Sequence, residues 1–234
     1  MPKEKVVVLS GAGISAESGL KTFRDAGGLW EGYDINEVAS IHGWKRAPQK
    51  VLEFYNLRRE QAAAADPNPA HIGLAELEEY YEVIVVTQNV DDLHERGGAS
   101  NVIHLHGELR KAKSEKDHSI IIDIGADPIK IGDTAEDGGQ LRPHVVWFGE
   151  MVPMLETAAI EVESADILIV IGTSLAVYPA AGLVNYAKPE ISKYIIDPST
   201  PQLLNNEGWI HFKEPASTGV AKLKKQLIKK KADS

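Results

Sequence analysis

The stretch KVVVLSGAGISA at residues 5–16 determines the fold class that the sequence predicts. Its first half, residues 5–10, is a nearly continuous aliphatic run, which is typical of a parallel strand covered on both faces. Gly11 and Gly13 follow at once, and glycines in such a turn let a phosphate approach the backbone closely. The stretch therefore predicts the first unit of a nucleotide-binding α/β domain.

Five further apolar runs predict strands of the same kind, and four longer segments predict helices. This alternation predicts an α/β fold built on a Rossmann-type, doubly wound parallel sheet. The predicted strands are residues 83–87, 101–105, 145–148, 167–171 and 193–196, and the predicted helices are residues 48–65, 70–81, 156–164 and 216–231.

Two segments do not fit a minimal Rossmann unit. About seventy residues separate the first two predicted strands, whereas a complete βαβ unit needs roughly thirty. We predict that residues 26–71 and 110–142 form a smaller inserted domain. The Rossmann domain would then consist of residues 1–25, 72–109 and 143–234.

Composition and charge restrict the class of protein. The 234 residues include 25 basic and 34 acidic side chains, for a net charge of −9, which argues against nucleic acid as a partner. No apolar run reaches the length of a membrane span, and the first residues lack the apolar core of a secretory signal. We therefore expect a cytoplasmic monomer that does not bind membranes. The basic segment 221–231 is expected to pack one apolar helix face on the domain.

Small and polar residues follow the predicted strands, at the edge where open α/β sheets bind ligands. The pair Gly11 and Gly13 is weak evidence by itself, because Ala16 stands where the G-x-G-x-x-G motif has its third glycine. No acidic residue ends a second strand about 20 residues later, as a hydride-transfer dehydrogenase requires. The sequence therefore favours an unusual nucleotide site over a dehydrogenase.

Five motifs in the same order resemble those of the sirtuin family. They are GAGISAESG with TFRD at residues 11–25, TQNVDDLH at 87–94, LHGEL at 105–109, PHVVWFGE at 143–150 and GTS at 172–174. The resemblance implies an NAD-dependent protein-lysine deacylase. Such an enzyme moves the acyl group of a modified lysine to ADP-ribose, and it releases nicotinamide and O-acyl-ADP-ribose.

The resemblance also assigns residue roles. His106 would be the general base, as suits a group whose pKa lies near neutrality, while His104 is the better candidate for a structural histidine. Asn89 and Asp91 would order the nicotinamide ribose and a water, although both residues also suit a helix N-cap. The residues implied to bind NAD are Gly11, Ala12, Gly13, Ser15, Phe23, Arg24, Gln88, Asn89, Asp91, Gly172, Thr173, Ser174, Asp197 and Ala216.

The implied partner is an acylated lysine of another protein, whose peptide adds as a strand between the domains. Val146, Trp147, Phe148 and Gly149 would line its path. Tyr55 and Arg58 lie three residues apart on a predicted helix and so share one face. They resemble the pair found in the desuccinylase and demalonylase branch, where an arginine pairs with the acyl carboxylate. A half-buried tyrosine beside a surface arginine is the alternative.

The sequence departs from the family in one respect. Most sirtuins bind a structural zinc through four cysteines in the small domain, and this chain has no cysteine. We expect no zinc or other metal, and we expect the isoleucine-rich runs at 119–124 and 129–131 to form a small apolar core instead. Two other functions stay open, a protein ADP-ribosyltransferase that uses the same site and a non-catalytic NAD-binding sensor.

Overall fold

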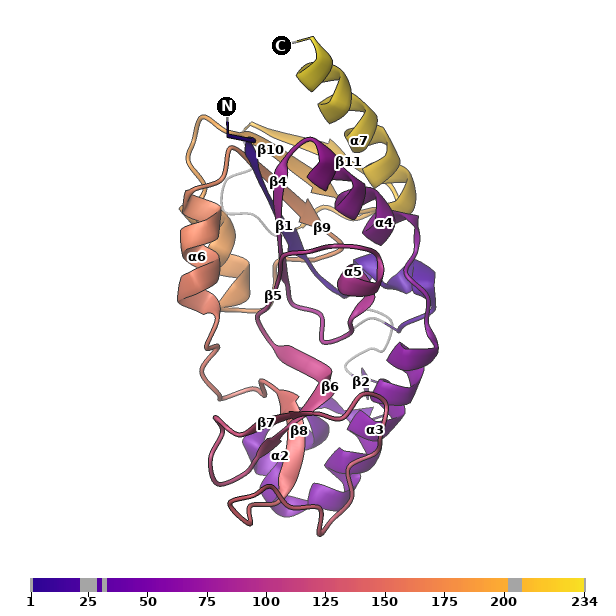
Figure 1. Cartoon of the computed structure of the whole chain (residues 1–234), viewed down its shortest axis with the longest axis vertical. Coiled ribbons are helices and arrows are strands. Elements are labelled where there is room, and N and C mark those ends of the chain that lie inside the picture. Colours follow the sequence, from indigo (N-terminus) through magenta and orange to yellow (C-terminus); the bar gives the residue numbers. More distant parts are fainter. Residues whose placement is uncertain (1, 22–28, 31–32, 202–207, 234) are drawn as a thin grey trace.

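The computed structural model describes residues 2–21, 29–30, 33–201 and 208–233, and its centre is a six-stranded parallel sheet (Figure 1). The strand order is β11-β10-β9-β1-β4-β5, which confirms the predicted fold class. In chain order the strands are β1 (Lys5–Ser10), β4 (Glu82–Thr87), β5 (Val102–His104), β9 (Ile167–Ile171), β10 (Ser192–Ile196) and β11 (Trp209–Phe212).

Helices cover both faces of this sheet (Figure 1). Alternate residues of β1 face opposite layers: Val6 and Val8 pack in the core with α4 (Pro69–Ala75) and α7 (Ala216–Ala232). Val7 and Leu9 pack in the second core with α6 (Leu155–Glu163) and the 3₁₀ segment η4 (Ala180–Tyr186). Burial on both faces explains why the strand is a continuous apolar run.

The C-terminal helix packs as its pattern predicts. Val220, Leu223 and Leu227 are buried in the core of the large sheet. Lysines on its outer side pair with glutamates, for example Lys231 with Glu4 at 2.9 Å. Within the described residues, no helix combines the length and apolar character needed to cross a bilayer.

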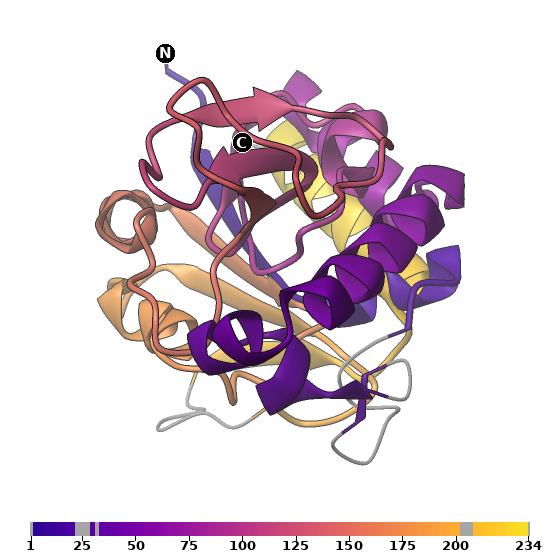
Figure 2. The same cartoon turned by 90° about the horizontal axis from the view of Figure 1, so that it is seen from below.

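A smaller half lies at the other end of the molecule, where three helices pack on a three-stranded antiparallel sheet of order β7-β6-β8. Figure 2 shows these helices beside the small sheet, in front of the large one. The elements are β2 (Leu29–Trp30), β3 (Tyr33–Asp34), α1 (Ile35–Val38), α2 (Ile41–Arg46), α3 (Pro48–Ala64), β6 (Gly107–Ser114), β7 (Ile121–Asp123) and β8 (Leu141–Val145).

The prediction of a parallel strand at residues 145–148 is wrong. Val145 ends β8, which pairs antiparallel with β6 in the small sheet. Beyond it, the Val146 N–H donates to the His106 carbonyl, and the Phe148 N–H donates to the Ala39 carbonyl. An apolar run indicates burial, but it does not say which sheet buries it. Residues 70–81 also differ from the prediction, because α4 stops at Ala75 and the 3₁₀ turn η3 (Glu76–Glu79) follows.

The isoleucine-rich runs supply only part of the core of the smaller half. Ile129 belongs to that core and Ile124 packs against it, whereas Ile121, Ile122 and Ile131 are 46%, 37% and 52% exposed. The other core side chains come from the helices, β6 and the end of β8, among them Trp44, Phe54, Tyr55 and Trp147. The expectation therefore holds only in part, because β-branched residues also suit the open face of a short edge strand.

A hydrogen-bonded carboxylate joins the loops of the small sheet. Asp137 accepts from the Ser114 hydroxyl at 2.7 and 2.9 Å, from the Gly139 N–H at 2.8 Å and from the Asp117 N–H at 3.2 Å. The Gly139 N–H and the Ser114 hydroxyl hold the pKa of Asp137 below its usual value. In the part of the chain that is described, no three His, Asp or Glu side chains come together as a metal site.

Candidate active site

A cavity of about 480 Å³ opens at the carboxyl ends of the large sheet's strands, against the smaller half. It brings together nearly all of the residues proposed for the site. They are Gly11, Ala12, Gly13, Ser15, Tyr55, Arg58, Gln88, Asn89, Asp91, His106, Val146, Trp147, Phe148, Gly149, Gly172, Thr173, Ser174, Asp197 and Ala216. Phe23 and Arg24, which the sequence also proposes, lie outside the described residues.

Two glycine turns form the floor of this cavity by packing backbone against backbone. The Gly13 N–H donates to the Gly172 carbonyl at 2.8 Å, and a Cβ on Gly13 would lie 2.7 Å from the Gly172 Cα. A Cβ on Gly11 would meet the Thr173 side chain at 2.7 Å. Gly172 has a φ of +62°, which favours glycine. Because these turns carry no side chains at the glycines, a dinucleotide phosphate can come close to their backbone. The residues present therefore fit NAD.

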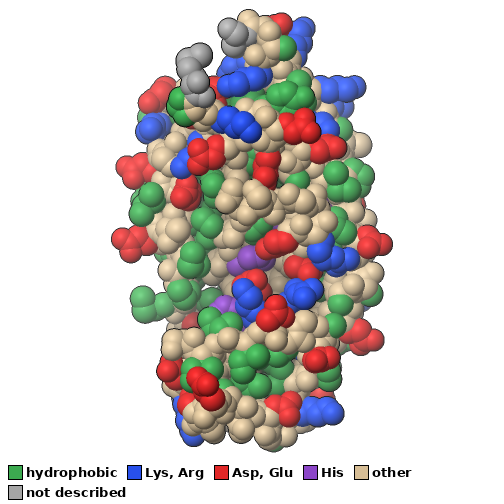
Figure 3. All heavy atoms as spheres, in the orientation of Figure 1, with side chains coloured by type: hydrophobic (Ala, Val, Ile, Leu, Met, Phe, Trp, Pro, Cys, Tyr) green, Lys and Arg blue, Asp and Glu red, His purple; other side chains and the backbone are tan. Residues whose placement is uncertain are grey.

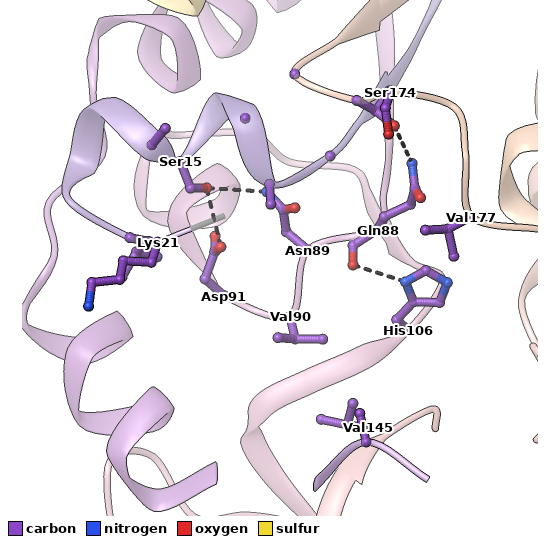
Figure 4. Close-up of a pocket in the computed structure, with 18 of the residues that line it drawn as sticks. Ser15, Lys21, Gln88, Asn89, Val90, Asp91, His106, Val145, Ser174 and Val177 are labelled. Carbon is purple, nitrogen blue, oxygen red and sulfur yellow. Dashed lines mark hydrogen bonds between the residues drawn. The ribbon is translucent and has the colours of Figure 1, made fainter. Parts of the chain in front are cut away.

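Ser15, Asn89 and Asp91 form a hydrogen-bonded group on one wall (Figure 4). The Asn89 amide donates to the Ser15 hydroxyl at 3.2 Å, and that hydroxyl donates to the Asp91 carboxylate at 3.2 Å. Burial raises the pKa of Asp91, although the Leu93 N–H and Ser15 oppose the shift. Neither Asn89 nor Asp91 is a helix N-cap, because the helix that begins at Leu93 has Asp92 at that position; the Leu93 N–H donates to one Asp91 oxygen at 3.2 Å. The other carboxylate oxygen lies in the group with Ser15.

His106 lies across the cavity from this group (Figure 4). Its Nδ1 lies 3.1 Å from the Gln88 carbonyl oxygen. A carbonyl only accepts, so Nδ1 carries the proton and Nε2 is left as the basic nitrogen. Burial lowers the pKa of His106, against the opposing effect of that carbonyl. The ring is therefore neutral at pH 7 and can accept a proton.

His104, two residues earlier, has a different environment. Its Nε2 lies 2.7 Å from a Glu95 carboxylate oxygen, and its Nδ1 lies 3.1 Å from the Asn89 carbonyl. Burial alone would lower the pKa of His104, but the bonds to Glu95 and Asn89 raise it above its ordinary value. This histidine thus fixes the backbone that carries Asn89.

Tyr55 and Arg58 lie at the end of the cavity formed by the smaller half. Both project from α3, and they are 2% and 6% exposed, so the alternative of a surface arginine is wrong. The Tyr55 hydroxyl accepts from the Trp147 indole N–H at 3.0 Å. Burial raises the pKa of Tyr55, so its own proton stays available to donate. Arg59, the next residue, lines a different cavity.

The segment from Val146 to Gly149 lines the cavity, and so do Val177 and Tyr178. Phe148 is 48% exposed and Tyr178 is 65% exposed, so both face a groove open to solvent. Trp147 is only 1% exposed. The Arg142 guanidinium stacks on its ring at 3.4 Å from the centroid.

Comparison with known proteins assigns the chain to a family. The Sir2 family, that of the sirtuins, matches residues 11–179. The chain belongs to the Sir2 family. It is 58% identical over 195 residues to the NAD-dependent protein deacylase of Helicobacter pylori strain J99, covering 83% of each protein. It is 50% identical over 230 residues to that of Bacteroides thetaiotaomicron, covering 96% of this chain and 98% of the relative.

Solved structures of Sir2 homologues have the same fold. A complex of a mutant Sir2 homologue with ADP-ribose superposes with a TM-score of 0.89 at 39% identity. It covers 97% of this chain and 93% of the other. A complex of a Sir2 homologue with NAD gives a TM-score of 0.88 at 39% identity, over 98% and 91% of the two chains.

Sequence reasoning missed one residue that positions the site of this Sir2 protein. Asn68 caps α4, and its side-chain amide donates to the Ile14 carbonyl at 2.7 Å and to the Ser18 hydroxyl at 3.0 Å. It therefore fixes the turn that follows β1. The sequence Asn68-Pro69 before a helix is the signal that indicates such a cap. Leu20, Lys21 and Val90 also line the cavity, but their residue types gave no indication that they belong to the site.

Proposed function

We propose that this member of the Sir2 family is an NAD-dependent protein deacylase that prefers lysines carrying acidic acyl groups, such as succinyl and malonyl. The relatives at 58% and 50% identity are named NAD-dependent protein deacylases. The preference rests on one observation: the buried guanidinium of Arg58 lines the same cavity as His106.

Three sets of residues in the cavity walls would share the binding of NAD. The glycine turns at Gly11, Gly13 and Gly172 would receive the phosphates through the backbone. Asp197 and Ala216, at the end of β10 and the start of α7, would take the adenosine end. The group of Ser15, Asn89 and Asp91 would hold the nicotinamide ribose, and an acidic oxygen there can accept from a hydroxyl.

NAD would supply an activated ribose carbon, which can bond to the acyl oxygen as its bond to nicotinamide breaks. His106 would accept the proton of a ribose hydroxyl at Nε2, while its Nδ1–H stays bonded to the Gln88 carbonyl. That bond fixes the tautomer and the ring orientation. General base catalysis of this kind is worth about 10²- to 10⁴-fold in rate.

The acyl end of the substrate would meet Tyr55 and Arg58. A guanidinium can bond a carboxylate through two N–H groups, and such charge-assisted bonds are stronger than neutral ones. The Tyr55 hydroxyl, which accepts from Trp147, has its own proton to give to the same carboxylate. An acetyl group has no carboxylate to accept from either donor.

The decisive experiment compares the succinyl and acetyl forms of one lysine peptide with the wild type and Arg58→Met. Loss of a charged hydrogen-bonding partner costs about 1.5–3 kcal/mol, so desuccinylation should fall about 10- to 100-fold in kcat/KM while deacetylation changes little. Tyr55→Phe should show the same direction with a smaller loss. Arg46→Met, which removes an arginine outside the cavity with a side chain 55% exposed, is the matched control.

The other outcomes separate the remaining functions. Equal losses for both acyl groups would remove the acyl preference and keep the deacylase. Transfer of ADP-ribose to protein without any acylated peptide would indicate an ADP-ribosyltransferase. Binding of NAD without release of nicotinamide would indicate a sensor.

A further inference from the structure

A second cavity of about 190 Å³ lies where the two halves of the molecule meet, behind the wall that carries Asp91. Its lining comes from α3, from the segment around α5 (Leu93–Arg96), from β6 and from the loop at Gly125. Val90 and Asp91 line this cavity on one side and the large cavity on the other. A single buried water needs far less space, on the order of 10–15 Å³ by the same kind of measure.

Arg59 is the buried polar group of this cavity, at 1% exposure. Its Nε donates to the Leu109 carbonyl at 2.6 Å, and its Nη1 donates to the Asn56 side-chain oxygen at 2.7 Å. Its Nη2 has no hydrogen-bond partner among the described residues. Burial lowers the pKa of Arg59 to about 10, so it stays charged at neutral pH. A buried cationic donor of this kind indicates a missing acceptor.

Two further guanidinium groups line the same cavity. Arg96 and Arg110 approach the two oxygens of Asp92 at 3.6 and 3.2 Å. Three arginines thus line the cavity together with Asp92, while the carboxylate of Asp91 bonds to the Ser15 hydroxyl and the Leu93 N–H. The Arg110 side chain is 52% exposed, so the cavity opens toward solvent on that side. Figure 3, which has the orientation of Figure 1, shows basic and acidic side chains gathered across the middle of the face that it draws.

We propose that this junction cavity, between Arg59, Arg96 and Arg110, binds a phosphate group. A phosphate offers three or four acceptor oxygens, enough to bond guanidinium groups that come from three different elements. A carboxylate offers two oxygens, so it has fewer acceptor positions for Arg59 and for the two arginines that already pair with Asp92. The site lies on the far side of the Val90–Asp91 wall from the large cavity, so it is distinct from the phosphate turns at Gly11 and Gly172.

Calorimetric titration of the whole protein tests this proposal, with ADP-ribose first added to saturate the large cavity. Inorganic phosphate should still bind at one site per chain at constant ionic strength. Arg110→Gln, an exposed change that spares the fold, should weaken this binding several-fold, and Arg59→Gln should weaken it at least tenfold. Lys111→Gln, which removes the next cation along β6 outside the cavity, should leave it unchanged.

Other ligands distinguish the possible sources of the phosphate, and some results would contradict the proposal. Tighter binding of glycerol phosphate than of free phosphate would indicate a phosphate ester as the natural ligand. Acetate that binds as tightly as phosphate would contradict the choice of a phosphate. Loss of all binding once ADP-ribose is present, or equal binding by wild type and both arginine variants, would overturn the proposal. None of these readouts depends on turnover, so they stand apart from the deacylase.

Discussion

The two halves of the molecule are stabilised in different ways. The large sheet is apolar on both faces: alternate residues of β1 and β9 enter two cores covered by helices. The smaller half has one aromatic core and relies at its other positions on polar contacts, such as those of Asp137 and the ion pair of Arg142 with Glu150 at 2.7 Å. His106 follows the large sheet, whereas Tyr55 and Arg58 belong to the smaller half.

From this division we expect that the proposed chemistry and the proposed acyl selection can be changed separately. The proposed base follows a strand of the rigid sheet, where its ring is held by the Gln88 carbonyl. The proposed selectivity residues project from a helix whose core residues are aromatic. A change in the large half should affect every acyl substrate alike, and a change at the acyl end should affect one class.

The largest effect is expected from His106→Ala. Removal of the base should lower kcat about 10²- to 10⁴-fold for both succinyl and acetyl peptides, while the affinity for ADP-ribose stays within about twofold. Nicotinamide release and calorimetry measure the two quantities. A loss confined to one acyl group would contradict the division between the halves.

The contrast between the core of the large sheet and the exposed isoleucine run of the small sheet can be tested by unfolding. Leu168→Ala, fully buried in β9, should lower the free energy of unfolding by about 2–5 kcal/mol. Ile121→Ala, at a residue 46% exposed in the small sheet, should change it by less than about 0.5 kcal/mol. Urea denaturation followed by circular dichroism gives both values. Equal losses would mean that the isoleucine run does contribute a core.

The ion pair of the smaller half provides the next test. The side chains of Arg142 and Glu150 are 4% and 13% exposed, so Glu150→Gln should cost about 3 kcal/mol by leaving a buried cation. Glu108→Gln breaks the ion pair of Glu108 with Lys111, whose side chains are more exposed than those of Arg142 and Glu150. It should cost less than about 1 kcal/mol. If the two variants lost equal stability, the contrast between buried and surface pairs would fail.

Acid should weaken the same pair. Burial alone would raise the pKa of Glu150, but Arg142 and the Trp147 N–H hold it below its ordinary value of 4.5. Because the folded pKa is the lower one, the pair's contribution is complete above that value and is lost as the pH falls through the lowered pKa. Protection of the β6 and β8 amides, measured against the intrinsic exchange rate at each pH, should therefore decrease as the pH falls below 4.5 in wild type, and less so in Glu150→Gln.

The smallest effect concerns the pH profile of the reaction. Burial lowers the pKa of His106 from 6.5, and the base works only when it is neutral. Activity should therefore persist below pH 6.5 and fall only as the pH passes the lowered pKa. The acid limb of kcat/KM reports this value. If the acid limb gave an apparent pKa above the ordinary histidine value, the ring would not be neutral at pH 7. That result would contradict the protonation state assigned from the Gln88 carbonyl.

The sequence was most informative where one physical rule decided the structure. Continuous apolar runs predicted β1, β4 and β9 because these strands are buried on both faces. The same rule assigned residues 145–148 to the wrong sheet, since burial does not reveal the partner. It also missed β11, a short edge strand in which Ile210 is 47% exposed.

Much of the candidate site could also be predicted, because simple geometric rules bring its residues together. Strand ends of a parallel sheet converge, so Gly11, Asn89, His106 and Gly172 could be expected at one edge. Helical spacing placed Tyr55 and Arg58 on one face. The junction cavity could not be predicted, because its arginines come from separate elements that meet only after the two halves have packed.

The most direct test of the proposed function is nicotinamide release from NAD by the wild-type protein with three forms of one lysine peptide. We expect the fastest release with the succinyl form, slower release with the acetyl form and only background release with the unmodified form. Equal release with all three forms would contradict acyl transfer, and release that is faster with acetyl than with succinyl would contradict the role of Arg58.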